Sequence, residues 1–120
     1  MPTFINHSNH SSVNWSKEQQ EAALAYGDIV DMPFPELHAD YTEQQICEAI
    51  RKSLDKIIAL APAAVLCQGE FTYTYNLVRL LKEREVKVLA ACSERIAHEK
   101  WDGGVSCKVS YFKFVQFREY

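Results

Sequence analysis

Short apolar runs alternate with amphipathic stretches through most of this chain. Residues 63–67, AAVLC, are apolar throughout, which is typical of a strand buried on both faces of a parallel sheet. Residues 43–61 repeat apolar side chains at helical spacing, with Thr42 as the expected cap and Pro62 as the stop. The same reasoning predicts strands over residues 2–6, 28–32, 63–67 and 86–91, and helices over residues 15–26, 43–61 and 72–85.

The last part of the chain has a different pattern. Residues 96–101 and 105–117 flank the turn Asp102-Gly103-Gly104, which predicts a β-hairpin. Aromatic residues alternate only imperfectly along its second arm. Strand–helix repeats followed by a hairpin predict the α/β class. We expect a small Rossmann-like three-layer sandwich, with a mostly parallel sheet and a C-terminal β-hairpin, in a single domain over residues 1–120.

Composition narrows the class of protein. The chain has 120 residues, 48% of them hydrophobic, and a net charge of -3. These values exclude a disordered chain and a basic nucleic-acid coat protein, so we expect no DNA partner. No apolar run is long enough to span a membrane, and no signal-peptide core is present. We therefore expect a cytoplasmic protein with no membrane partner.

The cysteines indicate no disulfide framework and no zinc module. Cys47, Cys67, Cys92 and Cys107 form no CxxC pair. Cys67 and Cys92 lie inside apolar runs, so we expect buried free thiols.

Three polar segments follow predicted strands: His7 to Ser12 (HSNHSS), Gln68 to Thr72 (QGEFT) and Ser93 to Arg95 (SER). In open α/β sheets, ligands bind beyond the carboxyl ends of strands where the strand order reverses. We expect the first strand to lie beside the third, which would bring these segments to one sheet edge. Hydroxyl and amide groups, aromatic rings such as Phe71, Tyr73 and Tyr75, and a helix N-terminus suit a nucleotide-like anion.

The same residues allow several alternative functions, which stay open at the level of sequence. The polar segments could be ordinary solvated loops. His7 and His10 could bind a metal with His38 or Asp40, as in a metal-dependent hydrolase. Ser93, His10 and Glu70 could form a catalytic triad. The chain contains no GxGxxG and no Walker loop.

Three stretches carry a resemblance to a known group of proteins. They are VLCQGEFTYTYNLV (65–78), VLAACSER (88–95) and FKFVQFREY (112–120), together with the opening NHSNHSS. This combination resembles single-domain relatives of the CARF-domain ring nucleases found beside type III CRISPR systems, which serve antiviral defence. The resemblance implies a cyclic oligoadenylate ligand, foremost cyclic tetra-adenylate, often bound across a two-fold homodimer, with room for a higher assembly with ligand. It implies no cofactor and no metal.

The resemblance also implies roles for particular residues. The segments 6–12 and 68–72 would form the cradle, Ser93 and Arg95 would reach phosphate, and His10 would transfer a proton beside Ser93. In ring nucleases of this kind, the 2′-hydroxyl of the ligand attacks the adjacent phosphate. The complete expected site is Asn6, His7, Ser8, Asn9, His10, Ser11, Ser12, Gln68, Gly69, Glu70, Phe71, Thr72, Ser93 and Arg95.

One departure affects the expected activity. Cations are scarce near these segments, with Arg95 clear and Lys17 a second candidate. A site so poor in cations could sequester the messenger without cutting it, so cleavage and sequestration both stay open. An alternative from another class is a small α/β regulatory module that acts through protein contacts of its aromatic hairpin.

Overall fold

The computed structural model describes residues 2–120, with all side chains in that range except that of Asp102. Five strands form one sheet, and the chain is of the mixed α/β class. The strands are β1 (Thr3–His7), β2 (Asp28–Asp31), β3 (Ala64–Cys67), β4 (Val88–Asp102) and β5 (Val105–Glu119). The helices are α1 (Lys17–Leu24), α2 (Glu43–Leu60) and α3 (Phe71–Glu83), with a 3-10 turn η1 (Ser12–Asn14).

The strand order is β2-β1-β3-β4-β5, which confirms that the first strand lies beside the third. The pairs β1–β2, β1–β3 and β3–β4 are parallel, and β5 runs antiparallel to β4. The chain builds outward from β1 to β2 on one side and from β3 to β5 on the other. The order therefore reverses between β1 and β3, which is where a ligand crevice is expected.

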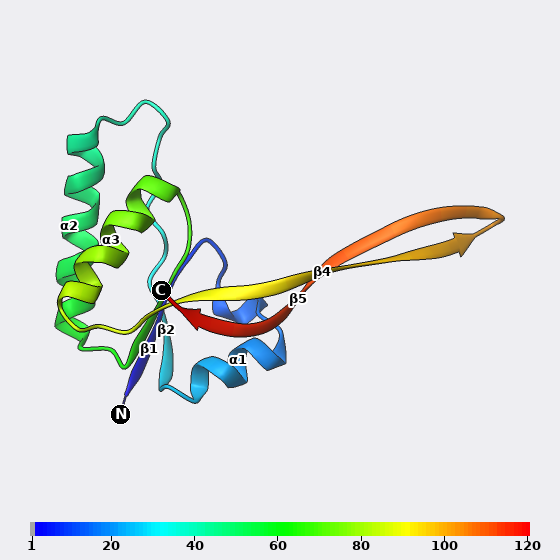
Figure 1. Ribbon diagram of the computed structural model, residues 1–120, viewed down its shortest axis with the longest axis horizontal. Helices are drawn as coiled ribbons and strands as arrows, with labels where there is room; N and C mark the ends of the chain where they lie inside the picture. Colours follow the sequence, from blue (N-terminus) through cyan, green and yellow to red (C-terminus); the bar gives the residue numbers. More distant parts are fainter. Residues whose placement is uncertain (1) are drawn as a thin grey trace.

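Helices cover both faces of the sheet (Figure 1). One core lies under α2 and α3 and contains Ile5, Val65, Cys67 and Val88. The other lies on the α1 side and contains Phe4, Ala64, Leu66 and Leu89. Neighbouring residues of each strand thus alternate between the two cores, because successive side chains of a strand point to opposite faces.

The start predicted for α2 is confirmed, whereas α1 begins two residues after its predicted start and α3 one residue before. Ser16 Oγ accepts a hydrogen bond of 3.2 Å from the Gln19 backbone N–H at the start of α1. Thr42 and Gln45 form a reciprocal capping box at the start of α2. These local hydrogen bonds satisfy backbone donors that lack partners within each helix.

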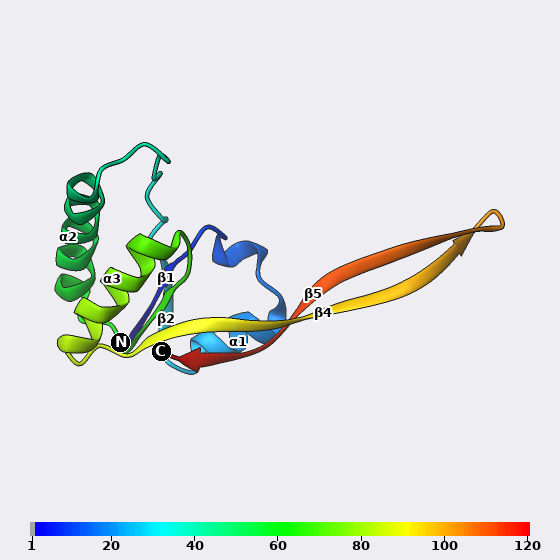
Figure 2. The same ribbon diagram turned by 45° about the horizontal axis from the view of Figure 1, so that its top comes forward.

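The predicted hairpin is confirmed, but its first arm is longer than expected. The segment Ser93 to Arg95 is not a turn, because β4 runs on without a break to Asp102. The two strands project from the body as a long ribbon (Figures 1 and 2). The longest dimension of the molecule is consequently 56 Å. Only a bulge between Cys92 and Ser93 marks the point where the ribbon leaves the body.

The expectation of buried thiols holds for Cys67 but is wrong for Cys92, which is half-buried. The other two cysteines, Cys47 and Cys107, are exposed. Burial raises the pKa of the Cys67 thiol to about 12, so this group is unreactive at neutral pH. None of the helices in residues 2–120 has both the length and the apolar character needed to cross a membrane.

Candidate functional site

A cleft of about 690 Å³ lies on the α1 side of the sheet, at the carboxyl ends of β1 and β3 and beside Ala91 and Ser93 in the first part of β4. Its floor includes Leu66 and Ala91. Its polar lining consists of Ser8, Asn9, His10, Asn14, Ser16, Gln19, Gln68 and Ser93, and its aromatic lining of Trp15, Phe112 and Phe114. All three predicted polar segments therefore contribute to one cleft.

Strand parity decides which predicted residues face this cleft. Phe4 and Leu66 point to the α1 side, whereas Ile5 and Cys67 point to the α2–α3 side. Gln68 follows Cys67 and lines the cleft. The His7 side chain points to the α2–α3 side of the sheet, as that of Ile5 does, and packs there against Phe34 and Tyr73.

Asn6 lies behind the cleft rather than in its lining, and it organises the loop above. Its side chain is 2% exposed. Asn6 Nδ2 donates to the His10 carbonyl and to Asp31 Oδ1, each at 2.8 Å. Asn6 Oδ1 accepts from Ser8 Oγ at 2.6 Å. One buried amide therefore fixes both ends of the loop segment that carries Asn9 and His10 into the cleft.

Asp31 holds the rest of the loop, and the sequence analysis missed it. Its carboxylate accepts hydrogen bonds from the Ser12 backbone N–H, at 3.2 Å, and from the hydroxyls of Ser12 and Ser11, at 3.0 and 3.3 Å. Partial burial works against ionisation of Asp31, but these bonds and that from Asn6 outweigh it and lower the pKa of the carboxyl. Ser11 and Ser12 are thus occupied by Asp31 and do not line the cleft.

His7 belongs to a buried hydrogen-bond network. Its Nδ1 lies 2.8 Å from the Met32 carbonyl, and its Nε2 lies 2.7 Å from the Tyr73 hydroxyl, which in turn contacts Ser53 Oγ at 2.6 Å. Burial lowers the pKa of His7, against a smaller raising effect of the Met32 hydrogen bond. Both ring nitrogens are engaged on the face opposite His10, so the two histidines cannot share a metal. Tyr73 is likewise buried and is not a stacking residue.

Gln68 and Gly69 shape the cleft from the β3 side. Gln68 Oε1 accepts a hydrogen bond from the Ala91 backbone N–H, which ties the end of β3 to β4. Within residues 2–120, no hydrogen bond uses Gln68 Nε2, so its donors are free for a ligand. A Cβ at Gly69 would collide with the Phe34 ring, so this glycine is required by packing as well as by its position at the cleft.

Glu70 and Thr72 serve the start of α3 and lie outside the cleft. Glu70 is the N-cap, and its carboxylate accepts from the backbone N–H of Thr72 at 2.8 Å and of Tyr73 at 3.1 Å. Hydrogen bonds from the Thr72 hydroxyl and backbone lower the pKa of Glu70. A carboxylate already occupies this helix N-terminus, so it is not available to a phosphate. The triad of Ser93, His10 and Glu70 is therefore not assembled.

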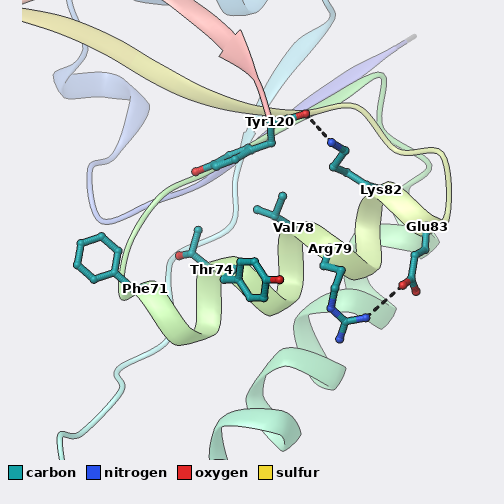
Figure 3. Close-up of a pocket in the computed structure, with 8 residues that line it drawn as sticks. Phe71, Thr74, Val78, Arg79, Lys82, Glu83 and Tyr120 are labelled. Carbon is teal, nitrogen blue, oxygen red and sulfur yellow. Dashed lines mark hydrogen bonds and ion pairs between the residues drawn. The ribbon is translucent and has the colours of Figure 1, made fainter.

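Phe71 lies in a different hollow. It is 88% exposed and lines a groove of about 910 Å³ with Tyr75 and Tyr120 (Figure 3). Tyr120 closes one side of this groove, where its hydroxyl donates to the Cys67 carbonyl at 2.7 Å. Phe71 and Tyr75 therefore cannot stack on a base held in the cleft.

The ribbon supplies the outer wall of the cleft. Ser93 is paired with Phe114, and Arg95 with Phe112, so these four side chains share one face. Ser93, Phe112 and Phe114 line the cleft. Arg95 lies one step farther out on the same face, where its Nη2 donates to Ser110 Oγ at 3.4 Å. On this face of the ribbon, Arg95 is the cation nearest in register to the cleft lining.

The bulge accounts for the imperfect aromatic alternation. Cys92 pairs with Gln116 and Ser93 with Phe114, which leaves Val115 unpaired. The extra residue brings Phe114 onto the same face as Phe117, and the two rings lie 4.9 Å apart. From the sequence, the aromatic hairpin was considered only as a surface for protein contacts, so Phe112 and Phe114 were not predicted as cleft residues. Trp15, Asn14 and Gln19 were also missed, because they lie on η1 and α1 rather than at a strand exit.

The cleft lining is electrically neutral apart from one titratable side chain. Its residues include no lysine, arginine, aspartate or glutamate, and His10 is its one imidazole. Amide and hydroxyl groups can hydrogen-bond riboses, phosphates and base edges, and aromatic rings can stack on bases. The arrangement suits a polar ligand with planar rings.

A family model described as the uncharacterized protein MJ1673 family matches residues 2–118. The chain belongs to this family. No curated protein and no solved structure matches the chain. The match to the MJ1673 family covers the cleft loops and the ribbon alike, so the two are parts of one family pattern.

Proposed function

We propose that the cleft binds a cyclic oligoadenylate, with cyclic tetra-adenylate as the first ligand to test, and that the protein thereby attenuates type III CRISPR signalling. The observation that carries the proposal is that neutral hydrogen-bonding groups after β1 and β3, and on β4, lie in one cleft with the rings of Trp15, Phe112 and Phe114. A volume of about 690 Å³ is within the range of roughly 300–1,000 Å³ typical of pockets for drug-sized ligands, so one cleft would hold part of the ring. The sequence resemblance to the ring-nuclease group points to the same ligand.

The fold supports this proposal. We class it as a small Rossmann-like three-layer sandwich, because helices cover both faces and the order β2-β1-β3-β4-β5 is that of a doubly wound sheet. The cleft lies at the reversal between β1 and β3, with β4 beside it. The partners that we propose are the cyclic ligand and a second copy of the chain.

The composition of the cleft favours sequestration over cleavage. For cleavage, the ligand's 2′-oxygen would form a bond to the adjacent phosphorus, the bond from phosphorus to the 5′-oxygen would break, and a 2′,3′-cyclic phosphate would remain. His10 could accept the 2′-hydroxyl proton, while the 5′-oxygen would take up a proton. Charge developing on the phosphate needs nearby donors or cations, and the lining offers the Ser93 hydroxyl with Arg95 just beyond it. We therefore expect binding with slow or no turnover.

Trp15 gives a direct test of binding. Because the chain has two tryptophans, the variant Trp101→Phe leaves Trp15 as its one indole reporter, within the cleft. We expect cyclic tetra-adenylate to change Trp15 fluorescence in a saturable manner. Asn9→Ala and Gln19→Ala should each weaken binding by about five- to ten-fold, the value of about 1 kcal/mol for one lost hydrogen bond.

Gln44→Ala is the matched control, because Gln44 is exposed on α2, away from the cleft. It should bind as the parent does. Equal affinity in the parent and in both cleft variants would remove this site from consideration.

A second candidate function is a regulatory module that works through protein contacts. The exposed aromatic ribbon favours it, since Tyr111 is 51% exposed and Phe112 75% exposed. This function requires no nucleotide binding, and Tyr111→Asp would abolish association with the partner. Saturable binding of the cyclic ligand that is lost in the cleft variants would decide against it.

A further inference from the structure

The ribbon, residues 93–114, has no core of its own. Most of its side chains are exposed on both faces, among them Trp101, Val105 and Tyr111. It extends away from the body in both views (Figures 1 and 2). A two-stranded ribbon alone is only marginally stable in water. A further surface is therefore needed to cover it.

The surface area of the chain indicates how much is uncovered. The accessible area is 8233 Å², whereas a compact monomer of 13.8 kDa is expected to expose about 6,600 Å². The radius of gyration is 17.0 Å, against about 13.6 Å for a compact chain of this length. The excess of about 1,600 Å² is more than the roughly 800 Å² that each partner buries in a standard interface.

The two faces of the ribbon differ in character. The cleft face carries Ser93, Arg95 and Ser110. The opposite face carries an apolar stripe, which we define as Ile96, Val105, Cys107, Val109 and Tyr111. His98 lies on the stripe face as well, with its ring 6.4 Å from that of Tyr111. The stripe is continuous along the ribbon, so it can pack against one long partner element.

We propose that this stripe packs against the same stripe of a second copy, in an antiparallel two-fold dimer. Two-fold packing requires a self-complementary surface. In this dimer, the two-fold axis passes near Ala97 and Ser110 and lies in the plane between the two ribbons. Each residue of β4 then lies opposite the residue of the partner's β4 that is equally far from Ala97 in the other direction along the strand. Glu94 then lies opposite the partner's Lys100, and the same pair forms again on the other side.

The apolar positions match under the same operation. Tyr111 falls opposite the partner's Val109, and Ile96 opposite the partner's His98. Tyr111 is 51% exposed and Val109 is 38% exposed, so both have surface to bury. The cleft faces point outward in this dimer. It therefore differs from a dimer that shares one ring across its axis, and it forms without ligand.

Charge reversal tests the register of this interface. We expect the protein to sediment as a dimer at micromolar concentration in the presence of a thiol reductant, which prevents disulfides through Cys47 and Cys107. Glu94→Lys should weaken the dimer about ten-fold, because it turns two attractive pairs of modest energy into repulsive ones. The double variant Glu94→Lys with Lys100→Glu should restore the parent affinity.

Glu99→Lys is the matched control, because Glu99 is in the same strand on the cleft face. It should leave the dimer intact, whereas Val109→Asp should give a monomer. Thermal unfolding of each variant checks that the body remains folded. A parent that is monomeric, a double variant no better than Glu94→Lys, or an open series of larger species would overturn the proposal. The last result would point to an interface at the groove lined by Phe71, Tyr75 and Tyr120. None of these outcomes depends on the proposed ligand.

Discussion

Asn6 shows how one buried polar residue can determine the shape of a binding loop. The Asn6 side chain makes hydrogen bonds with Ser8, the His10 carbonyl and Asp31. Asn9 and His10 carry no such anchors of their own and are exposed. The loop can thus present free side chains to a ligand while its backbone is held from below.

The first prediction at this scale concerns Asn6→Ala. The change removes the shortest hydrogen bond to the His10 carbonyl and to Asp31 Oδ1, each 2.8 Å, so the free energy of unfolding should fall by about 1–3 kcal/mol. Ligand affinity should fall as well. Asn76→Ala is the control, since Asn76 makes one exposed hydrogen bond, to the Thr72 carbonyl. Denaturant unfolding of both variants decides the matter, and equal losses would contradict the role given to Asn6.

The second prediction concerns His7 and pH. Its pKa in the folded state is lowered from 6.5, so the unfolded chain binds the proton more readily. Stability contributed by neutral His7 is complete above pH 6.5 and falls as the pH drops below it, by at most about 1.4 kcal/mol per pH unit. His7→Gln should flatten this dependence between about pH 5 and pH 7.

His38→Gln serves as the comparison, because His38 is exposed in the loop before α2, away from the ribbon. Its stability should keep the slope of the parent across the same pH range. If His7→Gln retains that slope too, the buried imidazole is not its source.

At the scale of elements, the caps of α1 and α2 and the buried strand β3 have local signals in the sequence, whereas the cap of α3, Glu70, was not predicted. Ser16 and Thr42 cap the helices that follow them, and the apolar run at residues 64–67 is β3. The end of β4 was not predictable in this way. Ser93, Glu94 and Arg95 are polar but contain no glycine or proline, so nothing stops the strand until Gly103.

Side-chain direction was the harder part of the site. A one-residue shift in where β1 ends decides whether His7 is a ligand residue or a core residue. The bulge at Val115 similarly reverses the faces of Phe112 and Phe114 relative to simple alternation from Phe117. Neither feature has a signal in a single sequence, because both depend on which strand is the neighbour.

A third prediction follows for the start of α3. Glu70→Ala removes the cap and should lower the free energy of unfolding by about 1 kcal/mol. Because the pKa of Glu70 is lowered from 4.5, this contribution is present above pH 4.5 and is lost as the pH falls below it. Ligand affinity should not change, since Glu70 is outside the cleft.

Glu48→Ala is the control for this prediction, because Glu48 is exposed within α2. It should affect neither stability nor binding. A large loss of ligand affinity in Glu70→Ala alone would show that Glu70 contributes to the binding site after all.

For the whole molecule, the ribbon joins two proposed surfaces. One face closes the cleft with Phe112 and Phe114, and the other carries the apolar stripe. Residues 93–114 include four basic and three acidic residues, whereas the rest of the chain has nine basic and thirteen acidic residues. The ribbon therefore has a net charge of +1 and the rest of the chain a net charge of -4, so the ribbon repels an anionic ligand less than the rest of the chain does.

The most direct test of the central claim uses labelled cyclic tetra-adenylate with the protein in excess and EDTA present. One portion is run on a native gel to detect binding, and the other is denatured and resolved to detect cleavage. We expect the ring to shift with the protein and to be recovered intact, with the shift weakened in Asn9→Ala and Gln19→Ala. A ring recovered as linear product would replace sequestration by metal-independent cleavage, with His10 and Ser93 tested next. No shift with cyclic oligoadenylates of any size would contradict the account.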